Sequence, residues 1–359
     1  MPVEYNRNVD LIKGFAMFLV VVGHSFFFSF GEYTSALTFK FLDSFQMPLF
    51  VAISGFLTGL KPLRFSLVKG IHYISSKAQR LLLPLILLPI LYAIVLNPDM
   101  TDAYYFYVNC LLTSIMHGGY WFTLVLFEIF VFYLIFSAIQ SLVNRKNNII
   151  LDLISFTIVY GLEYLCTMQL QELGDIYFTT LSLGKLKSLF PFFFIGFFVA
   201  RYSFLKKLLY NDIFFAVIAL VYVFTYAVVL KGAFDPGRFV IAILAMITVC
   251  NIIVRMAANK DGKVLRALQL IGKQSLPIYL IHYFFLPALP MIGAFLTTIP
   301  DPSRLFLTET ILAAINASIV ITVTLFTIKI IRTDKYLAFL CFGDRLKKKA
   351  FAQRVEEEA

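Results

Sequence analysis

Long apolar blocks, interrupted by short charged or turn-rich breaks, run along most of the chain. Most blocks approach the ~20 residues that an α-helix needs to cross a hydrocarbon core of ~30 Å. The pattern therefore predicts about ten transmembrane helices, at residues 9–30, 39–60, 80–97, 120–143, 149–169, 186–203, 212–230, 238–256, 270–296 and 305–331. A shorter apolar segment, 103–116, cannot cross and is expected to lie at the membrane interface.

The composition agrees with an all-α, polytopic integral membrane protein. Hydrophobic residues make up 60% of the 359 residues and charged residues only 14%, whereas soluble domains carry about a quarter charged residues. The first apolar block has the position of a signal peptide, but it contains Lys13 and His24 and lacks a clear small-residue cleavage site. We interpret it as an uncleaved first span in the lipid bilayer.

The charge distribution predicts how the chain is oriented. The net charge of +10 reflects 31 Lys and Arg residues, most of which fall in alternate loops. Because positively charged loops stay in the cytoplasm, both termini are expected there, in a cell (inner) membrane protein without a nucleic-acid partner. Residues 1–335 form the predicted transmembrane domain, and 336–359 a basic cytoplasmic tail. The four cysteines are scattered, without metal-ligand spacing, so no metal is expected.

Ionisable side chains inside the apolar blocks are candidate functional groups, because each is costly at membrane depth unless it is paired or hydrated. Lys13 and His24 lie eleven residues apart, close to three helical turns, and therefore share one helix face. A lysine reaching the interface and a histidine bonded to a neighbouring helix would give the same pattern. Glu128, about two turns inside block 120–143, must be protonated, paired or hydrated.

Two other positions combine polar residues with features of a binding site. Lys77 and Arg80 lie three residues apart at the entrance of block 80–97, where two cations suit a phosphate and equally suit positive-inside topology. Ser54 and Gly55 permit the close approach of a ligand or of another helix.

The later blocks add aromatic and polar candidates. His117 lies just outside block 120–143, and Trp121 lies at its outer interface, where tryptophan often anchors a helix. Ser275, Tyr279 and His282, at i, i+4 and i+7, form one polar stripe on an otherwise apolar helix. Such a stripe must face a cavity or a partner helix.

Five motifs occur in order: D-x-x-K-G-x-A with a histidine eleven residues after the lysine, then QMPLFVAISGFL, KAQRLLLP, YWF and SLPIYLIH. Together they resemble the acyltransferase-3 family of membrane-bound O-acyltransferases, which modify bacterial surface polysaccharides. The resemblance covers most of the chain and implies a core of ten transmembrane helices. It also implies transfer of an acyl group, most simply acetyl, from cytoplasmic acetyl-CoA to a saccharide hydroxyl on the outer side, without a metal.

The resemblance carries over to individual positions. Lys13 matches the family's arginine before the first-span histidine, His24 matches that histidine, and Lys77 and Arg80 match a pair of arginines. Lysine at two of these positions keeps the charge but loses the bidentate geometry of arginine. Lys13, Lys77 and Arg80 are accordingly expected to bind the phosphates of acetyl-CoA.

The remaining candidates complete the expected mechanism. Neutral His24 is expected to take the proton of the acceptor hydroxyl, with Glu128 or Asp10 orienting it. His282 and Tyr279 are expected to stabilise the oxyanion or contact the acceptor. The other predicted substrate contacts are Ser54, His117, Trp121 and Ser275.

Several alternatives stay open at this level. The residues do not distinguish direct transfer from a covalent acyl-histidine, acetyl from a longer acyl group such as succinyl, or one saccharide from another. A rival prediction is a transporter or flippase for a polysaccharide or lipid-linked sugar, which uses the same polar groups as a substrate path. The sequence has no internal repeat of the kind that transporters often show.

Overall fold

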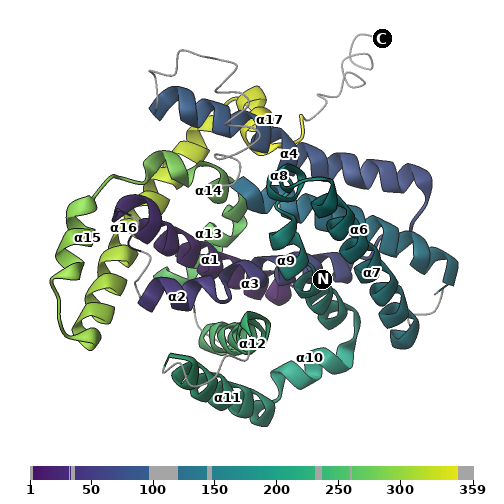
Figure 1. The fold of residues 1–359 in the computed structure, drawn as a ribbon, viewed down its shortest axis with the longest axis horizontal. Coiled ribbons are helices and arrows are strands. Elements are labelled where there is room, and N and C mark those ends of the chain that lie inside the picture. Colours follow the sequence, from purple (N-terminus) through teal and green to yellow (C-terminus); the bar gives the residue numbers. More distant parts are fainter. Residues whose placement is uncertain are drawn as a thin grey trace.

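The computed structural model describes residues 3–31, 33, 37–96, 120–143, 148–230, 237–258 and 261–346, which form helices and no β-strand (Figure 1). The first helices are α1 (Val3–His24), the π-helical turn η1 (Ser25–Ser29), α2 (Leu37–Asp43), α3 (Gln46–Leu60), α4 (Leu67–Leu96), α6 (Trp121–Val143) and α7 (Ile149–Leu173). They are followed by α8 (Asp175–Thr180), α9 (Leu183–Arg201), α10 (Ser203–Tyr210), α11 (Asp212–Leu230), α12 (Arg238–Ala257) and α13 (Lys263–Lys273). The last are α14 (Ser275–Ile281), the 3₁₀ turn η3 (His282–Phe285), α15 (Pro290–Thr297), α16 (Pro302–Ile331) and α17 (Lys335–Phe342).

Seven helical segments are long and apolar enough to cross a membrane, and the described residues give up to nine spans if each of two bent helix pairs counts as one. The seven are α1 with η1, α2 with α3, α6, α7, α9, α12 and α16. The bent pairs are α10 with α11 and α14 with α15, at angles of 69° and 87°. The polytopic all-α class is therefore confirmed, but the count of about ten spans is not.

The predicted span 80–97 accounts for the difference. It corresponds to the second half of α4, which is not among the candidate spans. Residues 81–96 form an apolar run in this helix after Lys69, Lys77 and Arg80, and the crossing of the membrane by this run stays a prediction. The predicted interfacial segment, 103–116, lies outside the described residues.

Block 270–296 is broken rather than continuous. α14 ends at Ile281, η3 follows, and α15 begins at Pro290. Pro287 and Pro290 explain the break, because proline lacks an N–H and cannot continue a helix. The bend leaves Ser275 and Tyr279 of the polar stripe on the short helix α14, which packs against α1, and places His282 at the start of η3.

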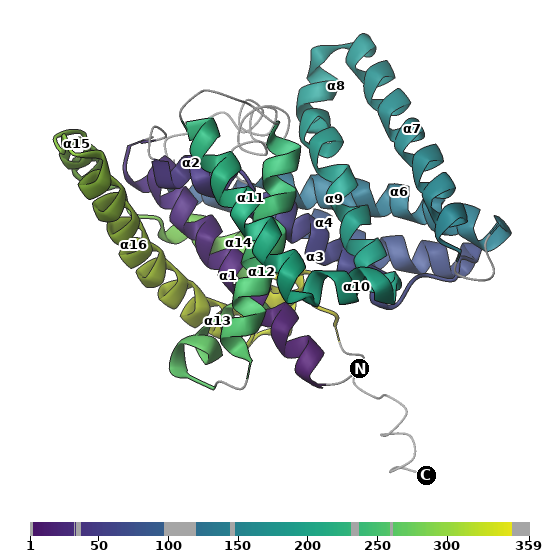
Figure 2. The same ribbon diagram turned by 90° about the horizontal axis from the view of Figure 1, so that it is seen from below.

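Figure 2 shows which helices lie at each of two opposite ends of the molecule. The start of α1 lies at the same end as α10 and α13, whereas α2, α8 and α15 lie at the opposite end. α10 and α13 fall in loops that were predicted to be cytoplasmic and carry several lysines and arginines. The orientation of this end toward the cytoplasm stays a prediction.

Glycine contacts bring α3 and α9 together. A Cβ added to Gly55 would overlap the carbonyl oxygen of Phe193, and one added to Gly196 would overlap that of Ala52. Only glycine lets the two backbones touch here, a packing mode common in membranes. Gly55 therefore serves helix packing, as one of its two interpretations predicted.

A second pair of glycines joins α1 to α13. A Cβ on Gly14 would overlap the carbonyl oxygen of Leu268, and one on Gly272 would overlap that of Asp10. Two of the quoted motifs therefore meet in space, since Gly14 follows Lys13 and Gly272 precedes the SLPIYLIH stretch. The contact fixes α1 beside the segment that continues into α14.

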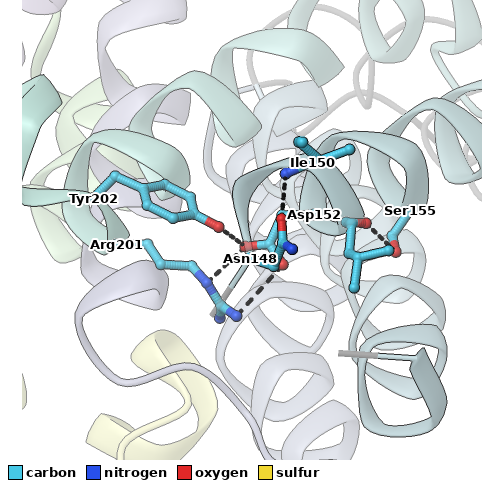
Figure 3. Close-up of polar contacts among 7 residues, drawn as sticks. Asn148, Ile150, Asp152, Ser155, Arg201 and Tyr202 are labelled. Carbon is cyan, nitrogen blue, oxygen red and sulfur yellow. Dashed lines mark hydrogen bonds and ion pairs between the residues drawn. The ribbon is translucent and has the colours of Figure 1, made fainter. Parts of the chain in front are cut away.

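A buried ion pair holds the start of α7 against the junction of α9 and α10 (Figure 3). Arg201 Nε lies 2.6 Å from Asp152 Oδ2, and the hydroxyl of Tyr202 donates to the same oxygen at 2.6 Å. Asp152 is completely buried. Removing either charge would leave the other uncompensated in a dry site, so the pair ties α7 firmly to this end of α9.

Part of the predicted tail packs on the membrane helices. Phe342 is 1% exposed and belongs to the main core, and Gln79 Nε2 of α4 donates to the carbonyl oxygen of Gly343 at 3.0 Å. Gly343 adopts a φ of +63°, and a Cβ there would overlap Gln79 O. The segment thus supports α4 next to Arg80. Residues 347–359 lie outside the described residues.

Candidate active site

His24 is the last residue of α1 and directly precedes the π-helical turn η1. Such turns are frequent at functional sites. Ser25 and Ser29 of this turn are buried, and Asn316 Nδ2 of α16 donates to their hydroxyl oxygens at 2.9 and 3.2 Å. The backbone that follows His24 is therefore fixed against α16.

His24 and His282 form a direct side-chain pair. The distance from His24 Nδ1 to His282 Nε2 is 2.7 Å, and the ring planes are 4° from parallel. His282 is completely buried, and its Nδ1 lies 2.9 Å from the carbonyl oxygens of both Ile278 and Tyr279. His282, the last residue of the predicted polar stripe, therefore faces the first-span histidine, as a stripe facing a partner helix was predicted to do.

These partners determine the tautomers of the neutral pair. A carbonyl oxygen can only accept, so His282 Nδ1 carries a proton and His282 Nε2 is an acceptor. That acceptor takes the N–H of His24 Nδ1, which leaves the free lone pair of His24 on Nε2. His24 can therefore act as a base through Nε2, and His282 is placed to hold it in this tautomer.

A cavity of about 380 Å³, the inner cavity, collects all three predicted phosphate-binding cations. Six of the predicted site residues line it: Lys13, Ser54, Lys77, Arg80, Ser275 and Tyr279. Lys61 and Thr58 also line it and were missed, because single polar residues near a loop gave no signal. Cations and small hydroxyl side chains in the lining of one cavity suit a ligand with an anionic head.

The cations of the inner cavity differ in their surroundings. Lys13 Nζ pairs with Asp10 at 2.8 Å, so Asp10 does not orient His24. Lys77, which precedes the predicted span 80–97, lies with its Nζ 3.8 Å from the ring centroid of Phe130. Burial, and secondly the charge of Arg80, lower the pKa of Lys77 to about 8.

A larger cavity of about 1010 Å³, the outer cavity, contains His24 and Trp121. Its walls are largely aromatic and include Phe28, Tyr160 and Tyr283. Lys185 also lines it, with its Nζ 3.9 Å from the ring centroid of Trp121. Aromatic faces with a few polar groups are typical of sites that bind an amphipathic ring such as a sugar.

Met47 and Tyr279 line both cavities. The inner and outer cavities therefore meet at these two side chains, and His24 belongs to the outer one. Met47 and its neighbour Gln46 were missed as site residues, although both belong to the QMPLF motif. An apolar residue and a neutral amide do not stand out in an apolar block, because neither carries a charge.

Glu128 and His117 are two predicted site residues that are not placed in either cavity. Glu128 of α6 lines neither cavity, and its carboxylate interacts electrostatically with that of Glu163 on α7. The catalytic role predicted for Glu128 stays a prediction, but His24 already has His282 as its partner. His117 lies outside the described residues. Within the described part of the chain, no group of three or more His, Cys, Asp or Glu residues is placed to hold a metal.

Comparison with known proteins agrees with this geometry. A family model described as an acyltransferase domain, that of the acyltransferase-3 family, matches residues 6–330. The chain belongs to the acyltransferase-3 family. The family resemblance predicted from the five motifs is thereby confirmed.

A curated relative points in the same direction. Nodulation protein NolL of Mesorhizobium japonicum is 37% identical over 87 residues, which span 23% of this chain and 22% of the relative. The match therefore covers less than a quarter of either protein. No solved structure matches the chain.

Proposed function

We propose that this acyltransferase moves an acetyl group from cytoplasmic acetyl-CoA to a hydroxyl group of a saccharide held in the outer cavity. The observation that carries the proposal is the meeting of two cavities of opposite character at Met47 and Tyr279, with His24 in the outer one. The inner cavity offers four cations, Lys13, Lys61, Lys77 and Arg80, for the 3′-phosphate and the diphosphate of CoA. The outer cavity offers aromatic walls for a sugar ring.

The reaction follows from the tautomer of His24. Nε2 of His24 takes the proton of the acceptor hydroxyl while its oxygen attacks the thioester carbonyl. The tetrahedral intermediate collapses, the C–S bond breaks, and the protonated His24 returns its proton to the CoA thiolate. The products are the sugar ester and free CoA. His282 keeps Nε2 unprotonated before each turnover by accepting the N–H of Nδ1.

Acetyl is the acyl group we favour. The inner cavity holds about 380 Å³ and must contain the pantetheine arm as well as the acyl group. The long apolar side chains Leu81, Leu126 and Phe130 line it and restrict its width. A small acyl group is therefore the better fit for the space between the donor arm and Met47.

The test uses full-length protein in lipid nanodiscs. Wild type is expected to bind acetyl-CoA and to transfer labelled acetyl to a saccharide acceptor. His24→Ala should lower kcat by about 10²- to 10⁴-fold while the Kd for acetyl-CoA stays the same, because the base is lost and the donor site is not. His72→Ala is the matched control, since His72 is exposed and lines neither cavity.

The outcomes separate the proposal from a transporter or flippase. A transporter needs no acyl donor, so folded wild-type protein that binds no acetyl-CoA would contradict the proposed donor. Unchanged transfer by His24→Ala would contradict the proposed base. Transfer of succinyl but not acetyl would correct the acyl group and leave the rest of the mechanism in place.

A further inference from the structure

The proposed mechanism leaves one buried polar group of the outer cavity unused. Gln46 lines this cavity together with His24, and only 6% of its surface is exposed. Its Oε1 is buried without a hydrogen-bond partner among the described residues. A buried amide oxygen that remains unpaired is destabilising, so its retention in a cavity points to a ligand that supplies the missing bond.

The amide lies next to the base. Gln46 is the first residue of α3, which follows the short helix α2 and packs against α1. A Cβ placed on Gly23 would lie 3.5 Å from Gln46 Nε2 and 3.6 Å from Gln46 Oε1, and Gly23 immediately precedes His24. The side-chain amide therefore rests on the backbone beside His24, within the same cavity.

The chemistry of the amide restricts its ligand. An amide oxygen accepts hydrogen bonds and never donates them, so the partner must carry an O–H or N–H group. Phenylalanine side chains form much of the surrounding wall and cannot supply such a donor to Oε1; among the aromatic residues, only the tyrosine hydroxyls and the indole N–H of Trp121 can. A polyhydroxylated acceptor brings several O–H groups into the cavity at once.

We propose that Gln46 binds a second hydroxyl of the acceptor, the one next to the reacting hydroxyl, and thereby orients the reacting oxygen toward His24 Nε2. The inference rests on the proposed function and narrows its substrate class to acceptors with neighbouring hydroxyl groups. Gln46 Oε1 accepts a hydrogen bond from the second hydroxyl. The first hydroxyl is left to His24. An acceptor with a single hydroxyl binds without this orientation.

The test compares acceptors as well as variants. Acetyl transfer is measured with wild-type, Gln46→Leu and Gln46→Asn protein in nanodiscs, first with a panel of methyl glycosides of glucose, galactose, mannose and N-acetylglucosamine. The best glycoside is then compared with its monodeoxy derivatives. Wild type should lose about 10- to 100-fold in kcat/KM when the hydroxyl bound by Gln46 is removed from the acceptor.

The variants should lose this discrimination. Gln46→Leu is expected to lower kcat/KM for the full glycoside by a similar factor, to treat the glycoside and that deoxy derivative alike, and to keep the Kd for acetyl-CoA. Gln46→Asn keeps the amide group but shortens the side chain, so the amide no longer reaches the second hydroxyl. This variant should show the same loss of kcat/KM and of discrimination, and it tests the inference even if Gln46→Leu does not fold. Gln140→Leu is the matched control, because Gln140 is also a buried glutamine with an unpartnered amide but lines neither cavity.

The results distinguish failure of this inference from failure of the proposed function. If wild-type protein transfers acetyl and both Gln46 variants still distinguish the full glycoside from its deoxy derivative, the role of Gln46 is overturned and the proposed function is not. Discrimination that depends on the amide N–H of N-acetylglucosamine, rather than on a hydroxyl, also overturns the stated ligand. Binding of acetyl-CoA without transfer to any glycoside overturns the saccharide acceptor and this inference with it.

Discussion

The inner and outer cavities meet at Met47 and Tyr279 but have opposite chemistry. The inner cavity is small and is lined by four cations, whereas the outer cavity is more than twice as large and is lined by many aromatic side chains together with Lys185 and Lys187. Fixed charges suit a ligand whose charged group does not vary, such as the phosphate groups of a cofactor. Broad aromatic surfaces suit a ligand that is recognised by shape and by a few hydrogen bonds.

In the proposed function, the donor and the acceptor each occupy a cavity of their own. Met47 and Tyr279 line both cavities and therefore lie between the two proposed substrates. His24, the proposed base, lines the outer cavity, and its partner His282 lies behind it. The comparison therefore predicts that changes in one cavity affect one substrate only.

The largest effect is expected from removing cations of the inner cavity. Lys77→Ala combined with Arg80→Ala should raise the Kd for acetyl-CoA by about 100-fold, because two charge-assisted contacts to phosphate are lost. The KM for the acceptor should stay within about twofold. Isothermal titration and acceptor-dependent transfer, both in nanodiscs, measure the two quantities.

A matched pair of surface cations serves as the control for this change. Arg64→Ala with Lys69→Ala removes the same charge from exposed positions just before and within α4, and neither residue lines a cavity. An equal loss of donor affinity in the control would mean that only overall charge matters. A raised acceptor KM in the Lys77 and Arg80 variant would break the division between the cavities.

A smaller effect is expected from the partner of the base. His282→Ala should lower kcat by about 10- to 100-fold without changing the Kd of acetyl-CoA, because His24 can then carry its proton on either nitrogen. His282→Gln supplies an amide oxygen that can accept the N–H of His24 Nδ1, and should recover part of the loss. The pH profile of kcat separates this positioning role from a structural one.

The His282 experiment has a clear contrary outcome. If Ala and Gln at position 282 give the same kcat and the same pH profile, His282 does not act by holding the tautomer of His24. A Kd for acetyl-CoA that changes along with kcat would instead assign His282 to the inner cavity.

The smallest effect is a pH dependence of donor binding. The pKa of Lys77 is lowered to about 8, so its positive charge is complete at neutral pH and is lost as the pH rises through that value. The Kd for desulfo-CoA should therefore increase by up to about tenfold between pH 7 and pH 9.5. Acceptor binding, which does not involve Lys77, should not follow the same curve.

Lys77→Arg sharpens this measurement. Arginine stays charged throughout the range, so the variant should bind desulfo-CoA with a flat pH dependence. The same increase in Kd for Lys77→Arg and wild type would exclude Lys77 as the titrating group.

Much of the architecture could be predicted from the apolar pattern. Seven predicted spans coincide with helices of membrane-spanning length because each needs only a long apolar run, which the sequence displays directly. The break of block 270–296 was not predicted, although Pro287 and Pro290 signalled it, because a proline inside a membrane helix is tolerated in many proteins. The span predicted at 80–97 falls on the second half of α4, and its crossing of the membrane stays a prediction.

The candidate site could be predicted in its residue types but not in its pairings. His24, His282 and the three cations stood out because charged and titratable groups are expensive in a membrane. Asp10 and Glu128 stood out for the same reason, yet one pairs with Lys13 and the other lies near Glu163. The cost of burial identifies such a residue but does not say which neighbour compensates it.

The amino-acid sequence by itself determined the membrane class, the positions of most spans, the family and three of the four cations that line the inner cavity. Those features depend on local runs and motifs that each lie within a few helical turns. Only the tertiary structure decided that His282 partners His24, that the two cavities meet at Met47 and Tyr279, and that Gln46 keeps an unpaired oxygen beside the base. These contacts join segments as far apart as α1 and α14, and their partners are set by how glycine-lined helices pack rather than by any local pattern.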